Sequence, residues 1–408
     1  MADFHQNGNI ATLHNLRTRS LDEMTYELET FAQTRKMALI LPCLYSELET
    51  EAMPRILAEL SKVTYLHRII IGLDRADEAQ FRHAKEFFKG LNQNHIVIWN
   101  DSPRMLALGA QLKDMGLAPA EQGKGKNVWS SLGYLIACQD SAVMAIHDCD
   151  IVTYTNDLLA RLIYPVANAN FPYQVAKGYY ARVGSDKLNG RVTRLLVSPL
   201  LIALKKVVGD RDYIDYLRAF RYPLSGEFAM RTNILPDLRI PSDWGLEIGV
   251  LSEAWRNLAP KSVCQVEIAD DYDHKHQDLS EADADAGLNR MSTDICKAIF
   301  RKLAADGTVF TPNVFRTLKA TYYRTALDLL DSYANDATMN GLSFDRHREE
   351  KSIELFAENI ISAGQVFLDN PHETPFIPTW HRVHAADPSF LADLRTAVSE
   401  DEAEFDPA

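Results

Sequence analysis

The 408-residue sequence lacks several features that mark whole classes of protein. It has no run of about 18 apolar residues, so no transmembrane helix is expected. Its first residues lack the apolar core of a signal peptide. There are only five cysteines, and no two form a Cys-x-x-Cys pair, which argues against a disulfide framework and against a zinc site. We therefore expect a cytoplasmic protein that does not insert into membranes.

Positively charged residues are also fewer than negatively charged ones. Forty-three Lys and Arg residues face 56 Asp and Glu residues, which gives a formal net charge of -13. This balance argues against nucleic acid or an anionic membrane surface as the main partner. Any anionic substrate must therefore be met by a local patch of positive charge.

The first half of the chain alternates short apolar runs with amphipathic stretches. The runs are continuous rather than alternating, which is typical of parallel strands covered on both faces. Strands are predicted at 36–42, 67–74, 95–100 and 142–150, and helices at 46–63, 76–91 and 125–138. Ser46 is the expected N-cap of the first of these helices, with Glu49 in the capping-box position. The pattern predicts an α/β fold with a mostly parallel, Rossmann-like sheet.

The second half is less regular and ends in helices. Strand-like pieces lie at 173–183, 223–231 and in the stretch that begins at Ser262, and helical patterns at 190–208 and 243–257. From about Ser280 the pattern is helical, at 294–305, 313–333 and 345–367, and the acidic last ten residues are expected to be disordered. We divide the chain into an N-terminal arm (1–35), a regular α/β part (36–152), a less regular part (153–285) and a helical C-terminal extension with an acidic tail (286–408).

The most informative short stretch is the end of the fourth predicted strand. In parallel sheets, ligands bind beyond the carboxyl ends of the strands, and here the strand delivers Asp148-Cys149-Asp150. Residues i and i+2 of a strand point to the same side, so the two carboxylates would repel each other without a cation between them. Spacing alone slightly favours a solvated polar turn, and the buried strand that precedes the triplet makes a divalent-metal site about equally favoured.

Two further stretches are candidates for binding anions. In "QGKGKNVW", Lys124 lies between two glycines at the start of a helix, although this stretch alone favours a flexible loop over a phosphate site. In "NGRVTRLL", a turn at Gly190 places Arg191, Thr193 and Arg194 in the first turn of an apolar helix. Cations there oppose the helix dipole, which favours a bound anion over two solvated arginines.

Two more side chains are candidates on weaker grounds. Glu227 follows a glycine inside an apolar stretch and needs a partner, either a ligand or a structural arginine such as Arg221 or Arg231. His274 and His276 alternate in a polar loop after the last predicted strand, so one of them could complete a metal shell that suits Mn²⁺, although a histidine in such a loop is usually solvated.

Several strings, taken in order, resemble glucosyl-3-phosphoglycerate synthases, which are retaining glycosyltransferases of the GT-A type. "KGYYARVGSDKLNGRVTRLLVSPLL" resembles their acceptor segment, and "YPLSGEFAM" and "WGLEIGVL" resemble the two motifs that follow it. "LPCLYSELE", "GKGKNVW" and "HDCD" occur upstream in the expected order. The resemblance covers roughly residues 36–279. It implies a GT-A-type domain, in which residues 36–152 are the nucleotide-sugar-binding domain and residues 153–285 are the acceptor-binding part.

The resemblance also implies roles for individual residues. The nucleotide sugar would be bound by Pro42, Leu44, Glu47, Gly72, Asp74, Lys124 and the Asp148-Cys149-Asp150 triplet. Cys149 itself alternates to the other side and is expected to pack into the sheet. Gly190, Arg191 and Thr193 would hold 3-phosphoglycerate, and Glu227 would contact the donor glucose or the acceptor hydroxyl. Asp150 and His274 would bind Mg²⁺ or Mn²⁺. Lys124, Asp150 and Glu227 are thus the expected catalytic residues.

The implied reaction transfers glucose from a nucleotide diphosphate, such as UDP-glucose, to the 2-hydroxyl of 3-phosphoglycerate. The product, glucosyl-3-phosphoglycerate, is expected to lead to the compatible solute glucosylglycerate. The sequence departs from the family in an acidic loop before His274 and in a longer C-terminal extension. We expect that extension to support a homodimer.

Other functions stay open at this point. A mannosyltransferase using GDP-mannose with 3-phosphoglycerate or glycerate would share the fold and the metal, although free glycerate would not need so many cations. A sugar-nucleotide pyrophosphorylase usually carries a glycine-rich signature after its first strand, where this chain has "LPCLYSE". A non-catalytic scaffold would have no need for Asp148, Asp150, Lys124 and Arg191 together.

Overall fold

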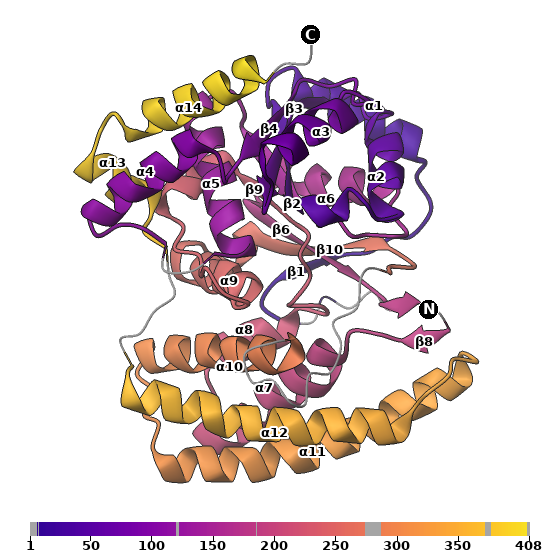
Figure 1. Cartoon of the computed structure of the whole chain (residues 1–408). Coiled ribbons are helices and arrows are strands. Elements are labelled where there is room, and N and C mark those ends of the chain that lie inside the picture. The colour runs from indigo at the N-terminus through magenta and orange to yellow at the C-terminus, as the bar shows by residue number, and fades with distance from the viewer. Residues whose placement is uncertain are drawn as a thin grey trace.

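The computed structural model describes residues 6, 8–119, 122–184, 186–273, 287–371 and 377–405. Within these residues, eight strands form one central sheet (Figure 1). Their order across the sheet is β1 (Ala11–Leu13), β10 (Val263–Ala269), β6 (Val175–Tyr180), β9 (Phe228–Arg231), β5 (Val143–Ile146), β2 (Met37–Leu44), β3 (Leu66–Asp74) and β4 (His95–Trp99). Neighbouring strands are parallel except where β9 pairs with β5 and β6. The predicted mostly parallel α/β sheet is confirmed.

The central strands are apolar on both faces because each face has its own core. In β2, Leu39 and Leu41 belong to one core, whereas Ala38 and Ile40 belong to the other. The first core is covered by α1 (Leu21–Ala32), α2 (Ala52–Leu60), α3 (Glu78–Phe88) and α6 (Asn156–Ala167). The second is covered by α5 (Lys124–Cys138) and by most of the helices that follow β6. Continuous apolar runs are therefore what this sheet requires.

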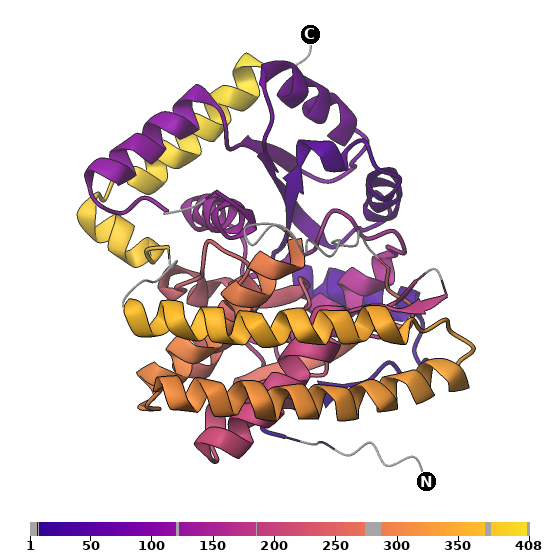
Figure 2. The ribbon, with the colours of Figure 1, turned by 60° about the horizontal axis from the view of Figure 1, so that its bottom comes forward.

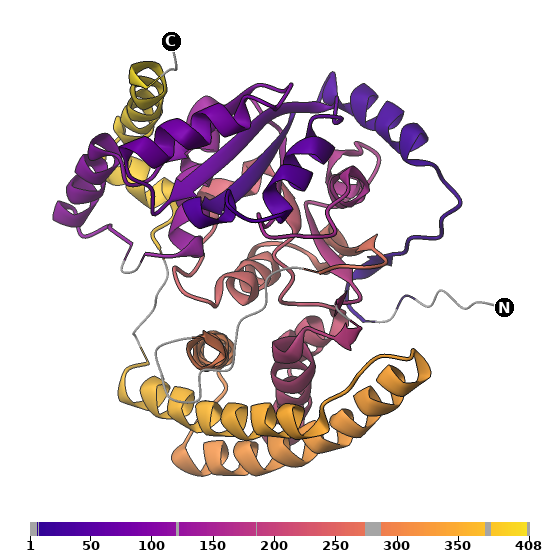
Figure 3. The ribbon, with the colours of Figure 1, turned by 45° about the vertical axis from the view of Figure 1, so that its right-hand side comes forward.

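The helices after β6 form two groups, which Figures 2 and 3 show on opposite sides of the sheet domain. One group is η2 (Val192–Val197), a π-helix that continues into α7 (Ser198–Val208), together with α8 (Asp212–Ala219), α9 (Leu246–Asn257), α10 (Gly287–Ala305), α11 (Pro312–Met339) and α12 (Arg346–Asp369). The other is α13 (Trp380–Ala386) and α14 (Phe390–Glu404), which returns to α4 (Pro103–Asp114) and α5. The predicted helical C-terminal region is thus confirmed. No helix in the described part of the chain is long and apolar enough to cross a membrane.

The short elements complete the chain. Within the described residues they are η1 (Tyr45–Glu47), η3 (Thr232–Asp237), η4 (Pro260–Ser262) and a small hairpin of β7 (Val183–Gly184) and β8 (Lys187–Leu188).

Two local predictions were wrong. Ser46 is not a helix N-cap, because η1 intervenes and α2 begins only at Ala52. The acidic C-terminus is not disordered as far as it is described, because α14 continues to Glu404. Its carboxylates have cationic partners: Arg104 pairs with Glu400, Asp401 and Glu404, and Lys85 pairs with Glu402.

The C-terminal helices support the helix that carries Lys124. Trp380 of α13 stacks on Trp129 of α5 with ring centroids 4.0 Å apart. Its indole nitrogen donates to the Trp129 carbonyl oxygen at 3.1 Å, and that of Trp129 donates to the Pro378 carbonyl oxygen at 2.9 Å. Gly133 provides the space, since a side chain there would collide with the Trp380 ring.

We therefore expect Trp380→Ala to lower the free energy of unfolding by about 3–5 kcal/mol, because it leaves a large cavity against α5. Urea denaturation followed by circular dichroism measures this change. Met339→Ala, at a side chain that is 80% exposed, is the matched control. A loss below about 1 kcal/mol would show that α13 does not support α5.

Candidate active site

The candidate site lies where the parallel strands end. β9 runs antiparallel to β5, with Ile146 opposite Phe228. The end of β5 and the start of β9 therefore meet at the same edge of the sheet, and Asp148 comes close to the Gly226-Glu227 pair. A Cβ atom at Gly226 would collide with the Asp148 carboxylate, which explains why a glycine precedes Glu227.

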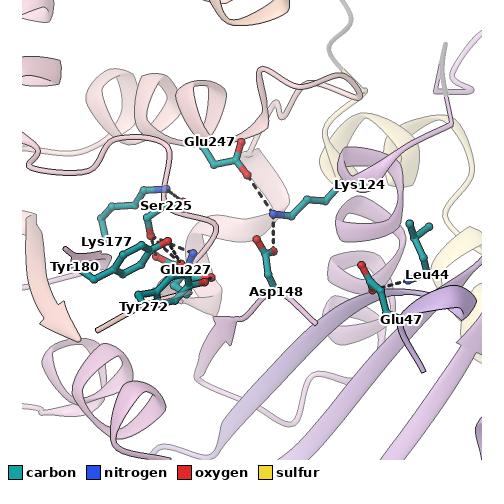
Figure 4. A network of polar contacts seen from close by, with 10 residues as sticks. All are labelled: Leu44, Glu47, Lys124, Asp148, Lys177, Tyr180, Ser225, Glu227, Glu247 and Tyr272. Carbon is teal, nitrogen blue, oxygen red and sulfur yellow. Dashed lines mark hydrogen bonds and ion pairs between the residues drawn. The ribbon is translucent and has the colours of Figure 1, made fainter. Parts of the chain in front are cut away.

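Lys124 is held between two carboxylates (Figure 4). Its Nζ atom lies 2.6 Å from Asp148 Oδ1 and 3.2 Å from Glu247 Oε1, and its side chain is 30% exposed. Burial favours the neutral amine, but Asp148 and Glu247 outweigh it and hold the pKa of Lys124 well above its ordinary value. Helix α5 begins at Lys124 itself rather than after it. The site thus presents a permanent cation at a helix N-terminus.

Glu227 is fully buried and surrounded by hydroxyl groups. Tyr180 donates to its Oε2 at 2.8 Å, Tyr272 donates to its Oε1 at 2.6 Å, and Ser225 donates to Oε2 at 3.1 Å. Burial, with the nearby Asp148 charge, raises the pKa of Glu227, while Tyr272, Lys124 and Tyr180 oppose this shift. The structural-arginine alternative is wrong: the Arg221 guanidinium lies over the Tyr179 ring, and that of Arg231 donates to the Val166 and Phe171 carbonyl oxygens.

Lys177 of β6 is a second buried cation beside this cluster. Its Nζ atom donates to the Ser225 carbonyl oxygen, and burial lowers its pKa to about 8 although Glu247 and Glu227 oppose the shift. It therefore helps to fix the loop that carries Glu227. Its one signal in the sequence is that a lysine lies inside an apolar strand.

The residues predicted to border the nucleoside follow β2. Register pairs Pro42 with Gly72 and Leu44 with Asp74, so these four positions line the ends of β2 and β3. The Leu44 amide donates to Glu47 Oε2 at 2.9 Å, which turns the carboxylate back over the strand end. Burial raises the pKa of Glu47 to about 7.

Gly72 and Asp74 are fixed by two asparagines. Asn127 of α5 donates to the Gly72 carbonyl oxygen at 2.6 Å, and only glycine leaves room for this side chain. Asn100 donates to Asp74 Oδ1 at 2.7 Å, while burial raises the pKa of Asp74 to about 6. Asn127 thereby ties helix α5 to the end of β3, and Lys124 ties the same helix to Asp148.

Cys149 packs inward, as the alternation of side chains predicts. It is 1% exposed, and burial raises the pKa of its thiol well above the ordinary value. The Cys43 and Cys149 sulfur atoms and a Glu47 oxygen all lie within 4.8 Å of one another. Cys149 thus connects the Asp148 and Asp150 turn to β2 from the buried side.

The predicted acceptor-binding residues form a separate part of the site. Gly190 has a φ of +70°, which confirms the turn, and η2 follows directly. Arg191 and Arg194 are not solvated as the alternative supposed: both pair with Glu349 of α12. The Thr193 hydroxyl is buried and has no hydrogen-bond partner among the described residues. His274 lies outside the described residues.

The donor set at the end of β5 fits a hard divalent cation. Asp148 and Asp150 supply carboxylate oxygens, the ligands that Mg²⁺ and Mn²⁺ prefer. Asp148 is already paired with Lys124. Gly226 lies against the Asp148 carboxylate and has no side chain that could cover it. Asp150 is therefore the better candidate for direct coordination.

Comparison with known proteins identifies the family. Over 401 residues the chain is 45% identical to glucosyl-3-phosphoglycerate synthase of Persephonella marina, with 98% of this chain and 99% of that protein covered. This chain belongs to the glucosyl-3-phosphoglycerate synthase family. A member from Methanococcoides burtonii is 36% identical over 408 residues, with 99% of each chain covered. No protein-family model matches the chain.

Solved structures of a family member share the fold. Glucosyl-3-phosphoglycerate synthase of Mycobacterium tuberculosis, in complex with Mn²⁺, UDP-glucose and phosphoglyceric acid, is 20% identical with a TM-score of 0.53. The match covers 72% of this chain and 88% of that one. A complex of the same protein with Mg²⁺ and UDP gives a TM-score of 0.52 at 21% identity, over 72% and 86% of the two chains. The expected GT-A-type architecture is confirmed.

Proposed function

We propose that this glucosyl-3-phosphoglycerate synthase family member transfers glucose from UDP-glucose to the 2-hydroxyl of 3-phosphoglycerate in the cytoplasm, with retention at the anomeric carbon. Family membership supports the reaction, and the Mycobacterium tuberculosis structures contain these two substrates or close relatives of them. The observation in this chain that carries the proposal is the cluster of Lys124, Asp148 and Glu227 at the edge of the sheet.

The donor side needs a cation for the diphosphate. Asp150 would hold Mg²⁺ or Mn²⁺, with Asp148 beside it on the nucleotide side and His274 as a further ligand. When bound, the ion neutralises charge on the leaving diphosphate. The nucleoside would be bound by Pro42, Leu44, Glu47, Gly72 and Asp74. Ribose hydroxyls can donate to the Glu47 and Asp74 carboxylates there.

Lys124 acts on the charge that develops as the bond from glucose C1 to the diphosphate breaks. Its ammonium group is already held in place by Asp148 and Glu247, so no reorganisation is needed when the charge appears. The acceptor hydroxyl forms the new bond to C1, and its proton passes to the leaving phosphate oxygen. This route places attack and departure on one face of the sugar, which gives retention.

Glu227 is suited to orienting sugar hydroxyls rather than to attacking the sugar. Three hydroxyl donors already surround its carboxylate, so it is held in one orientation. The rings of Tyr180 and Tyr272 stack beside it with their centroids 3.6 Å apart and form a rigid wall. We assign Glu227 to the donor glucose or the incoming acceptor hydroxyl.

A panel of nucleotide sugars and acceptors tests this function. The purified protein is incubated with UDP-glucose or GDP-mannose and with 3-phosphoglycerate or glycerate, and the products are identified by mass. We expect glucosyl-3-phosphoglycerate as the main product. Preferential formation of a mannosyl product, or transfer to free glycerate alone, would refute the assignment.

Arg191 should determine acceptor affinity without affecting the donor. We expect Arg191→Ala to raise the KM for 3-phosphoglycerate about 10- to 100-fold, because one charge-assisted hydrogen bond to the acceptor is lost. The KM for UDP-glucose should change less than about twofold. Steady-state kinetics with each substrate varied in turn measures both. Equal increases in the two KM values would contradict the role.

A further inference from the structure

The acceptor-binding segment is enclosed by a pair of helices far away in the sequence. The part of the acceptor segment that concerns these contacts is residues 186–197, and we define the helical hairpin as α11, α12 and the turn between them. Figures 2 and 3 show the two long helices side by side beneath the sheet domain. α11 and α12 contact each other along their lengths, and both contact η2.

The central contact is a buried carboxylate between two guanidinium groups. Glu349 of α12 is only 7% exposed. Its Oε2 atom lies 2.9 Å from an Arg194 terminal nitrogen, and its Oε1 atom lies 3.4 Å from Arg191 Nε. Burying a carboxylate is costly unless cations and hydrogen bonds compensate it. Glu349 therefore depends on both arginines, and it partly offsets their unfavourable position at the start of a helix.

Three other contacts attach the hairpin to the same segment. The Tyr322 hydroxyl donates to the Leu195 carbonyl oxygen at 2.6 Å. The Ser343 amide and hydroxyl, in the turn of the hairpin, donate to the Asp186 carbonyl oxygen at 2.8 and 3.1 Å. Arg194 also lies over the Tyr333 ring, 5.0 Å from its centroid. The hairpin thus holds residues 186–197 at their beginning, middle and end.

The two arginines have different tasks in this arrangement. Arg194 donates to the Asn189 and Leu188 carbonyl oxygens at 2.8 and 3.0 Å, so it stabilises the turn. Arg191 makes no such backbone contact among the described residues, and its side chain is 21% exposed. The hydrogen bond from Arg191 to Glu349 uses Nε, at 3.4 Å, and neither terminal nitrogen of Arg191 donates a hydrogen bond to any residue that the structure describes. The guanidinium is oriented, but its donors are left for an anion.

We propose that Glu349 is a positioning residue of the acceptor site, which orients Arg191 toward the phosphate or carboxylate of the acceptor. The helical hairpin is thereby a part of that site rather than only an appendage. This inference rests on the proposed function. The group of Arg191, Arg194 and Glu349 has one net positive charge, so it binds an anionic acceptor while Glu349 keeps the arginines in place.

Glu349→Gln keeps the shape of the side chain and removes its charge. We expect it to raise the KM for 3-phosphoglycerate about tenfold, because Arg191 loses its fixed orientation. The KM for UDP-glucose should change less than about twofold. Glu350→Gln is the matched control on the same helix, because Glu350 is half-buried, with its side chain 38% exposed, and pairs with Arg346. That variant should behave like the unsubstituted enzyme.

A double-mutant cycle separates positioning from a general effect on folding. In the Arg191→Ala background, Glu349→Gln should change the KM for 3-phosphoglycerate less than about twofold, because Glu349 acts through Arg191. If the full tenfold effect persists in that background, or if Glu349→Gln alone has no effect, the proposal is wrong. An unsubstituted enzyme that does not glucosylate 3-phosphoglycerate would instead refute the proposed function.

A second variant covers the case in which Glu349→Gln does not fold. Arg191→Lys retains the charge but cannot present a fixed fork to Glu349 and an anion at once. We expect it to raise the KM for 3-phosphoglycerate about tenfold with an unchanged thermal unfolding midpoint. An unchanged KM in Arg191→Lys would overturn the positioning role independently.

Discussion

Replacing Lys124 with methionine is expected to lower kcat about 10²- to 10³-fold, the typical effect of removing one preorganised group that stabilises transition-state charge. The length and apolar stem of the side chain are kept, and only the ammonium group is lost. Because Lys124 also separates Asp148 from Glu247, the substitution leaves two carboxylates close to the diphosphate. Donor affinity should therefore fall as well.

The measurement is steady-state kinetics at saturating 3-phosphoglycerate, with release of UDP as the readout. Lys113→Met is the matched control, since Lys113 is an exposed lysine on α4. Circular dichroism verifies that both variants fold. If Lys124→Met kept more than about a tenth of kcat, the main charge stabilisation would have to come from another residue.

Replacing Asp150 with alanine is expected to weaken the binding of UDP-glucose about 100-fold in the presence of Mn²⁺, since several kcal/mol of metal-mediated attraction are lost. Without metal, the variant and the unsubstituted protein should bind UDP-glucose equally weakly. The difference between the two conditions isolates the part of binding that depends on the cation.

Isothermal titration calorimetry with and without Mn²⁺ measures this difference. Asp328→Ala, on the exposed surface of α11, controls for the loss of one negative charge. Unchanged affinity of Asp150→Ala for UDP-glucose with Mn²⁺ would contradict the role of Asp150. It would direct attention to Asp148 as the direct ligand.

Much of the fold could be predicted because its signals are local. The four apolar runs of the first half correspond to β2, β3, β4 and β5, and their continuous character follows from two cores on opposite faces of the sheet. The helix at the acidic C-terminus is not predictable locally, because its cationic partners, Arg104 and Lys85, lie about 300 residues away in the sequence. Composition alone does not show such pairing.

The candidate site was predictable only in part, for the same reason. The positions of Asp148, Lys124 and Arg191 can be predicted from local patterns, namely strand ends and a glycine turn. Their partners are remote: Glu247 is 123 positions from Lys124, and Glu349 is 158 positions from Arg191. A cation at a helix N-terminus indicates that an anion is needed. It does not tell whether that anion is a substrate, a side chain or, as we propose for Arg191, both.

The structure of the product tests the central claim most directly. The purified protein, supplied with UDP-glucose, 3-phosphoglycerate and Mg²⁺, should release UDP and one new sugar, which nuclear magnetic resonance can define. We predict an α-linked glucose on the 2-hydroxyl of 3-phosphoglycerate. A β-linkage, attachment at another oxygen, or hydrolysis of UDP-glucose without transfer would contradict this account.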